Sequence, residues 1–206
     1  LRTDFIANAS HELRTPLASL KGFIETLQGS AKDDAVARQR FLAIMQEQAE
    51  RMARLINDLL SLNRVEMRER VPPSEPVELA EVVETAIKAM QVLAEPAGIA
   101  LSFTHLAGGA VVLGDRDELG QVAQNLIQNA IKYGRRGGRV DVALRRNGAR
   151  VALAVADDGI GIPPQHLPRL TERFYRVSAK ESRDRGGTGL GLAIVKHIVN
   201  RHRGEL

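Results

Sequence analysis

The first residues that could do chemistry are His11 and Glu12, in the stretch NASHELRTPLASL (residues 8–20). An imidazole can act as a nucleophile at neutral pH, and a neighbouring carboxylate can accept the proton of its second ring nitrogen. Thr15 lies one helical turn further on. Pro16 cannot donate a hydrogen bond to the carbonyl of Glu12, so we expect the helix to bend there. Taken alone, an exposed His-Glu pair is usually ordinary surface.

A second group has residue types that bind nucleotides. In QVAQNLIQNAIKYG (residues 121–134), Asn125 and Asn129 lie four positions apart and so share one helix face, with Lys132 and Tyr133 one turn on. Amide oxygens suit a hard cation such as Mg²⁺, and a lysine suits a phosphate. Two asparagines on a helix are nevertheless more often surface residues than ligands.

The stretch DDGIGIP directly follows the apolar run VALAVA, which predicts a strand. Asp157 therefore lies where a strand ends, and Gly159 and Gly161 allow the chain to turn tightly against a flat ligand. A carboxylate there could accept a hydrogen bond from the exocyclic amine of adenine. The simpler alternative is an Asp-Gly turn without a ligand.

A fourth group combines Phe174, Tyr175 and Arg176 with a polar segment and a glycine-rich stretch, GGTGLGL, that opens a helix. Glycines at a helix start expose N–H groups that suit phosphate oxygens. The pattern is weak by itself, and it is neither a dinucleotide-binding fingerprint nor a protein-kinase loop, because no strand precedes it and no VAIK or HRD sequence accompanies it. Its candidate binding residues are Gly187, Thr188, Gly189, Leu190 and Gly191.

Two long amphipathic helices are predicted to carry the first group. Apolar residues recur every three or four positions from Ile6 to Leu27, which predicts a helix ending near Gly29, and a second run at 41–62 keeps heptad spacing. His11 lies roughly 200° around the helix from the neighbouring apolar residues and should point to solvent. Because a lone hairpin leaves apolar surface exposed, we expect two copies to pair into a four-helix bundle.

Three prolines between residues 72 and 76 end the helical pattern and place a domain boundary near 68–76, which divides the chain into 1–70 and 71–206. The second part alternates between helical and strand patterns, which predicts an α/β domain. Helices are expected at 77–93, 115–133 and 189–203, and strands at 99–104, 110–113, 140–144 and 151–155.

Local signals set two of these boundaries. Asp115 and Glu118 resemble an N-capping pair at the start of a helix. Asn147-Gly148 predicts a tight turn between two strands. Both signals support the α/β interpretation of the second part.

Composition excludes several classes of protein. Among 206 residues, 44% are hydrophobic and none is cysteine, which rules out disulfides and thiolate chemistry. No apolar run approaches the ~18 residues of a membrane span, so we expect any membrane anchor to lie outside this chain. The net charge is +4, but aromatics are only 3% and the basic residues are dispersed, so nucleic-acid binding is not expected. Four histidines without ligand-like spacing are expected at the surface: His105, His166, His197 and His202.

Together, the four groups resemble a known family. FIANASHELRTPL resembles the H box of the sensor histidine kinases of two-component signalling, QNLIQNAIKYG their N box, DDGIGIP their G1 box, and FYR with GGTGLGL their F and G2 boxes. The resemblance implies that ATP phosphorylates His11, that the first aspartate, Asp157, reads adenine, and that Asn125 and Asn129 hold Mg²⁺ and phosphate oxygens. It also implies that the polar segment before GGTGLGL is a lid over ATP.

The resemblance also implies a fold class, α+β. A helical hairpin for dimerisation and phosphotransfer would precede an α/β sandwich of the GHKL (Bergerat) ATPase type. The family usually continues past HRGEL with a strand or hairpin, so the last layer of the sheet is expected to be incomplete. The wording of HLPRLTERFYRV and GLAIVKHIVNRH is similar to the phosphate-regulon sensor kinases. The chain is then expected to be the cytoplasmic portion of a bacterial protein anchored in the inner membrane.

The family's mechanism gives the remaining residues roles. Glu12 would orient and deprotonate the imidazole, Lys132 and Arg176 would neutralise phosphate charge, and the phosphoryl group would pass from His11 to an aspartate of a response-regulator receiver domain. Thr15 matches a phosphatase pattern of the family. Two alternatives remain: a GHKL ATPase that drives conformational change, which would have a glutamate where Asn125 stands, and a scaffold or phosphatase-only relative.

Overall fold

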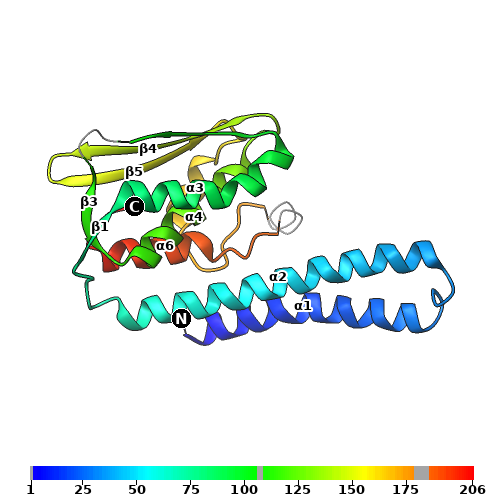
Figure 1. Cartoon of the computed structure of the whole chain (residues 1–206). Helices are drawn as coiled ribbons and strands as arrows, with labels where there is room; N and C mark the ends of the chain where they lie inside the picture. Colours follow the sequence, from blue (N-terminus) through cyan, green and yellow to red (C-terminus); the bar gives the residue numbers. More distant parts are fainter. Residues whose placement is uncertain (1, 106–108, 179–185) are drawn as a thin grey trace.

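The computed structural model describes residues 2–105, 109–178 and 186–206. The chain begins with a long helical hairpin formed by α1 (Arg2–Gln28) and α2 (Ala35–Arg68) (Figure 1). The carboxylate of Asp34 caps α2 by accepting hydrogen bonds from the next turn. No helix within the described ranges is long and apolar enough to cross a membrane.

The first helix passes through Pro16 as one continuous element, and the proline ring is fully buried. The predicted stop near Gly29 is confirmed, because α1 ends at Gln28. Phe23 and Phe41 stack across the hairpin with ring centroids 5.2 Å apart. The hairpin was therefore predictable from helical spacing alone.

The second part contains five strands and five further helical elements over the described residues. They are β1 (Glu75–Glu78), α3 (Leu79–Ala94), η1 (Glu95–Ala97), β2 (Ala100–Thr104), β3 (Val111–Gly114), α4 (Arg116–Tyr133), β4 (Arg139–Asn147), β5 (Arg150–Asp157), η2 (Pro164–Arg169) and α6 (Gly191–Arg201). A three-stranded sheet has the order β2-β4-β5, with β2 parallel and β5 antiparallel to β4, and β1 and β3 form a separate antiparallel pair.

One face of the larger sheet packs against α3 and α4. Alternate residues of β4, namely Val140, Val142 and Leu144, are buried there with Val83 and Ile127 from the two helices. The predicted fold class, a helical hairpin followed by an α/β sandwich, is confirmed.

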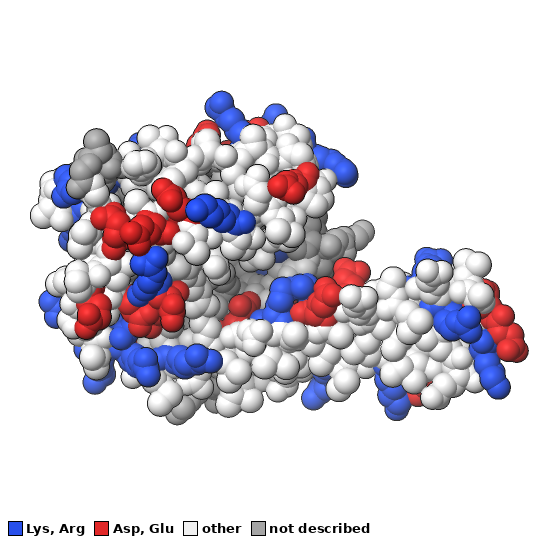
Figure 2. All heavy atoms as spheres, viewed as in Figure 1, with Lys and Arg blue, Asp and Glu red and all other residues white. Residues whose placement is uncertain are grey.

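Helix α6 lies between the sandwich and the hairpin (Figure 1). Leu55, Leu62 and Val65 of α2 are buried against Ile194 and Ile198 of α6. This second apolar cluster joins the two parts of the chain, so the sandwich is docked on the hairpin. On the face shown in Figure 2, acidic and basic side chains are interspersed rather than separated by sign.

Three local expectations were wrong in detail. Strand β1 was not predicted, because its four residues include Pro76 and it forms only by pairing with β3. The β4–β5 turn is centred one residue later than expected, since Asn147 pairs with Arg150 and Gly148 has a φ of 61°. Asp115 caps α4 as predicted, but Glu118 forms an ion pair with Arg201 instead of completing a capping box.

Candidate functional site

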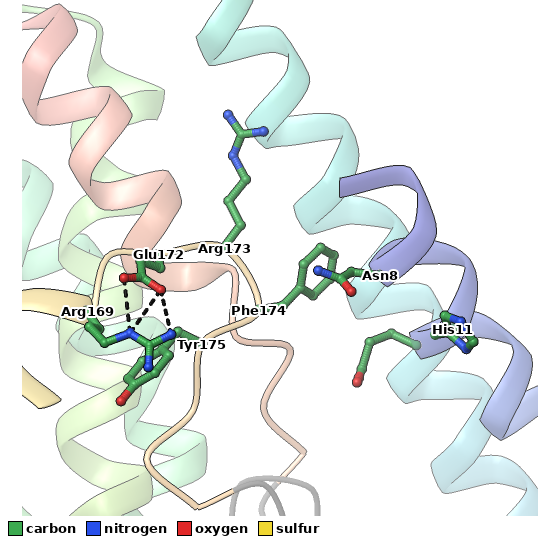
Figure 3. Close-up of a pocket in the computed structure, with 8 residues that line it drawn as sticks. Asn8, His11, Arg169, Glu172, Arg173, Phe174 and Tyr175 are labelled. Carbon is green, nitrogen blue, oxygen red and sulfur yellow. Dashed lines mark hydrogen bonds and ion pairs between the residues drawn. The ribbon is translucent and has the colours of Figure 1, made fainter. Parts of the chain in front are cut away.

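His11 lies on the exposed side of α1, as predicted, beside a cleft between the hairpin and the segment after η2 (Figure 3). The cleft has a volume of about 400 Å³. It is lined by Asn8, His11, Glu12, Arg169, Glu172, Arg173, Phe174 and Tyr175. The hydroxyl of Thr15 donates to the main-chain carbonyl of His11 at 3.2 Å, so these two residues share a helical turn.

The carboxylate of Glu12 is bound by two arginines. Arg176 Nη2 donates to it at 2.8 Å and Arg51 Nη2 at 3.3 Å. Arg176 Nη2 also donates to the carbonyl of Thr188 at 2.8 Å, and only 7% of the Arg176 side chain is exposed. Glu12, which was predicted to act on His11, is therefore bound here by guanidinium groups from α2 and from the segment after η2.

A compact set of contacts fixes the opposite wall of the cleft (Figure 3). Arg169 donates to both carboxylate oxygens of Glu172 and stacks on the ring of Tyr175 at 4.3 Å. The hydrogen bond from Arg169 holds the pKa of Glu172 below its usual range. The hydroxyl of Tyr175 lies 2.6 Å from Nδ1 of His166. These contacts position the segment that carries Arg176.

The four residues of the predicted N box lie along α4 and are all partly exposed: Asn125, Asn129, Lys132 and Tyr133. The start of α6 approaches this helix closely. A Cβ atom on Gly191 would lie 2.9 Å from Oδ1 of Asn125, so only a glycine fits there without a shift. The Asn125 amide of α4 therefore lies against the end of the glycine-rich stretch.

The predicted G1 residues lie where β5 ends. The Asp157 carboxylate accepts a hydrogen bond from the N–H of Gly159 at 2.9 Å. A side chain at Gly159 would collide with the carbonyl of Tyr133, and Gly161 has a φ of 71°. The absence of a side chain thus brings Asp157 next to the C-terminal end of α4.

The predicted F and G2 residues contact each other directly. Phe174 has a φ of 64°, and its N–H donates to the carbonyl of Gly189, which has a φ of 75°, at 2.8 Å. Leu190 is fully buried and anchors the start of α6. Because Leu190 has no polar side chain to cap that helix, the first N–H groups of α6 suit an anion. Gly187 is partly exposed.

These observations fit a nucleotide with a divalent cation. The donor set supplies amide oxygens, a lysine and helix N–H groups, and Gly191 leaves room for the Asn125 amide at the start of α6. The residues of the polar segment expected to form a lid, 179–185, lie outside the described residues.

Sequence reasoning missed an acidic residue of α2 at this site. Oδ2 of Asp58 accepts a hydrogen bond from the hydroxyl of Thr188 at 2.6 Å. Burial raises the pKa of Asp58 above its ordinary value of 3.8, while Thr188 and Arg54 act in the opposite direction. No signal for this contact was present in the sequence, because the heptad position between Leu55 and Leu62 is taken by Leu59 and Asp58 lies beside it.

Two histidines expected at the surface are not there. His197 lies 3.3 Å from Glu69 and 3.6 Å from Glu66 of α2, and its side chain is 20% exposed. Nε2 of His202 accepts a hydrogen bond from the N–H of Asp115 at 3.0 Å, and 8% of its side chain is exposed. Both were misjudged because their partners are distant in sequence.

Comparisons with known proteins identify two domain families. Residues 1–68 match the His Kinase A (phospho-acceptor) domain, and residues 114–206 match the histidine kinase-, DNA gyrase B-, and HSP90-like ATPase domain. The Phosphate regulon sensor protein PhoR of Pseudomonas aeruginosa is 42% identical over 207 residues, covering 100% of this chain and 46% of that protein. The chain spans about half the length of the curated relatives it matches.

Solved structures agree with these matches. The mycobacterial sensor histidine kinase MprB is 35% identical with a TM-score of 0.57, and the match covers 65% of this chain and 83% of that one. Histidine kinase ThkA, solved in complex with response regulator protein TrrA, has a TM-score of 0.74 at 21% identity, covering 98% of this chain and 55% of that one. The second likeness shows the shared fold over nearly the whole chain.

Proposed function

This chain belongs to the sensor histidine kinases, with a phospho-acceptor domain and an ATP-binding domain, and we propose that it phosphorylates itself on His11 at the expense of ATP. The observation that carries the proposal is the exposed imidazole beside a cleft whose other wall belongs to the ATP-binding part. We assign residues 1–70 to dimerisation and phosphotransfer and 71–206 to ATP binding.

The nucleotide would lie between α4, the turn after β5 and the start of α6. Asp157 would accept a hydrogen bond from adenine, and Gly159 and Gly161 would let the main chain approach the base. Lys132 and the first N–H groups of α6 would bind phosphate oxygens.

Asn125 and Asn129 would hold Mg²⁺, whose charge would offset that of the phosphates. Oδ1 of Asn125 already points to the start of α6, where the phosphates would lie. Arg176 would add a further positive charge once it leaves Glu12.

In the transfer step, a ring nitrogen of His11 forms a bond to the terminal phosphorus, the bond to the bridging oxygen breaks, and ADP leaves. The imidazole gives up one proton, which Glu12 would accept once its arginine partners release it. Positioning and charge neutralisation supply most of the acceleration in reactions of this type.

The phosphoryl group would pass from His11 to an aspartate of a response-regulator receiver domain docked on the hairpin. His11 is accessible to such a partner because it is exposed on α1. Thr15, one turn away, would orient a water molecule for hydrolysis of the regulator's phosphoaspartate. The likeness to PhoR favours phosphate-starvation signalling by the cytoplasmic portion of a membrane-anchored protein.

A homodimer would cover the exposed apolar face of the hairpin. Ile6, Leu17 and Ile24 of α1 lie at spacings of 11 and 7 and are 61%, 57% and 43% exposed. Ile56 and Leu60 of α2 are also exposed, at 44% and 52%. A four-helix bundle from two hairpins would bury both rows.

The experiment compares incorporation of ³²P from [γ-³²P]ATP into wild type and His11→Ala, with His105→Ala as an exposed control. Labelling of wild type and the control but not of His11→Ala is expected. Equal labelling of all three would exclude His11 as the acceptor. ATP hydrolysis without any labelled protein would favour a conformational GHKL ATPase instead.

A further inference from the structure

Two carboxylates of the hairpin form hydrogen bonds with residues of the proposed nucleotide site. Asp58 of α2 accepts the hydroxyl proton of Thr188 at 2.6 Å, and Glu12 of α1 accepts from Arg176 at 2.8 Å. Arg176 also donates to the carbonyl of Thr188, so the two contacts form one connected set. Thr188 and Arg176 thus face the hairpin together.

These contacts occupy the hydroxyl of Thr188 and the Nη2 group of Arg176. A threonine hydroxyl has one proton to donate, and Thr188 gives it to Asp58. The Nη2 group of an arginine has two, and Arg176 gives them to Glu12 and to the carbonyl of Thr188. A phosphate oxygen is also an acceptor, so it cannot bind these same donors while the carboxylates hold them.

We propose that Asp58, together with Glu12, competes with the nucleotide phosphates for the Thr188 and Arg176 side chains, so that the docked arrangement excludes nucleotide. The inference rests on the proposed function, because it takes the ATP site to lie at the start of α6. It assigns Asp58 a role in setting nucleotide affinity.

The contact with Asp58 is suited to displacement. Burial of this carboxylate is unfavourable, as its raised pKa indicates, and so the hydrogen bond to Thr188 is partly offset. When only a fraction of the molecules is competent to bind, the apparent Kd increases by the inverse of that fraction. Nucleotide binding would in turn weaken docking by the same factor.

The test measures the Kd of the Mg²⁺ complex of a non-hydrolysable ATP analogue by calorimetry, on the full 206-residue chain. Asp58→Ala removes the acceptor, and we expect the analogue to bind about threefold to tenfold more tightly. Asp58→Asn keeps an amide oxygen that can accept from Thr188, so its effect should be smaller. This near-isosteric variant also guards against a folding defect in Asp58→Ala.

Glu47→Ala is the matched control, because Glu47 is an exposed carboxylate of the same helix. The Kd of Glu47→Ala should equal that of wild type. If Glu47→Ala bound the analogue as tightly as Asp58→Ala does, the effect would come from net charge alone, and the inference would be overturned. An unchanged or weaker affinity in Asp58→Ala would also overturn it. If wild type itself did not bind the analogue, the proposed function would be contradicted instead.

Discussion

Arg176 Nη2 lies 2.8 Å from the carboxylate of Glu12, although 164 positions separate the two residues in the chain. Glu12 follows the proposed phosphoacceptor, and Arg176 belongs to the segment that precedes the glycine-rich stretch. The ion pair therefore reports directly on whether the ATP-binding part is docked on the hairpin. In the docked arrangement the Glu12 carboxylate is bound by both Arg176 and Arg51.

We predict that Glu12→Gln lowers the free energy of unfolding by about 1–3 kcal/mol, because it leaves a largely buried guanidinium without its charged partner. Urea titration monitored by circular dichroism measures the change. Glu25→Gln is the control, since the Glu25–Lys21 pair is well exposed and should contribute less than about 1 kcal/mol. The double variant Glu12→Gln/Arg176→Gln should lose less than the sum of the single changes, and strict additivity would show that the two side chains do not interact.

The raised pKa of Asp58 predicts a pH dependence of stability. A carboxyl group whose pKa is higher in the folded chain binds its proton more tightly there, so protonation favours the folded state. That contribution is fully present below pH 3.8 and is lost as the pH rises through the raised pKa. We therefore expect Asp58→Asn to have a higher Tm than wild type at neutral pH.

The difference in Tm should shrink as the pH falls towards the ordinary value of 3.8. Thermal scans of both proteins across this range measure it. Asp33→Asn, at an exposed loop position, corrects for the general effect of removing one carboxylate. A Tm difference that is constant or grows at low pH would contradict the assigned burial of Asp58.

Helical spacing predicted the hairpin and the exposure of His11, because a side chain's direction on a helix follows from its position in the sequence. Alternating apolar residues and the Asn147-Gly148 turn predicted β4 and β5, because these signals are also local in the sequence. The N-cap at Asp115 was also local and was confirmed. These features depend on residues that are neighbours in the chain.

Features that depend on contacts between residues far apart in the chain were not predictable in this way. Asp58 meets Thr188 across 130 positions, and His197 meets Glu69 across 128. Strand β1 exists only because Val77 pairs with Val112 of β3.

Arg201 of α6 connects the second part of the chain to the end of the hairpin. Its Nε donates to the carbonyls of Arg68, the last residue of α2, and of Val71, which follows α2. Its guanidinium pairs with Glu118 of α4, and 7% of its side chain is exposed. We expect Arg201→Met to lower the free energy of unfolding by about 3–5 kcal/mol, because Glu118 is left as an unpaired, mostly buried charge.

Urea unfolding of Arg201→Met is compared with Arg116→Met, a change at an ion pair whose two side chains are 56% and 64% exposed. The control should change the free energy of unfolding by no more than about 1 kcal/mol. Similar losses in the two variants would mean that the buried network around Arg201 adds nothing to the stability of the docked structure.

Gly159 tests whether the turn after β5 and the end of α4 form one binding site. Its position requires a residue without a side chain, since a Cβ atom would collide with the carbonyl of Tyr133. Gly159→Ala must displace the turn that carries Asp157, and because such misplacement removes optimal contacts, we expect a loss of at least about tenfold in affinity for the Mg²⁺ complex of the ATP analogue. Gly22→Ala, on α1, is the control, because no atom lies within 4 Å of its added Cβ. Unchanged binding by Gly159→Ala, with a circular dichroism spectrum like that of wild type, would place the adenine elsewhere.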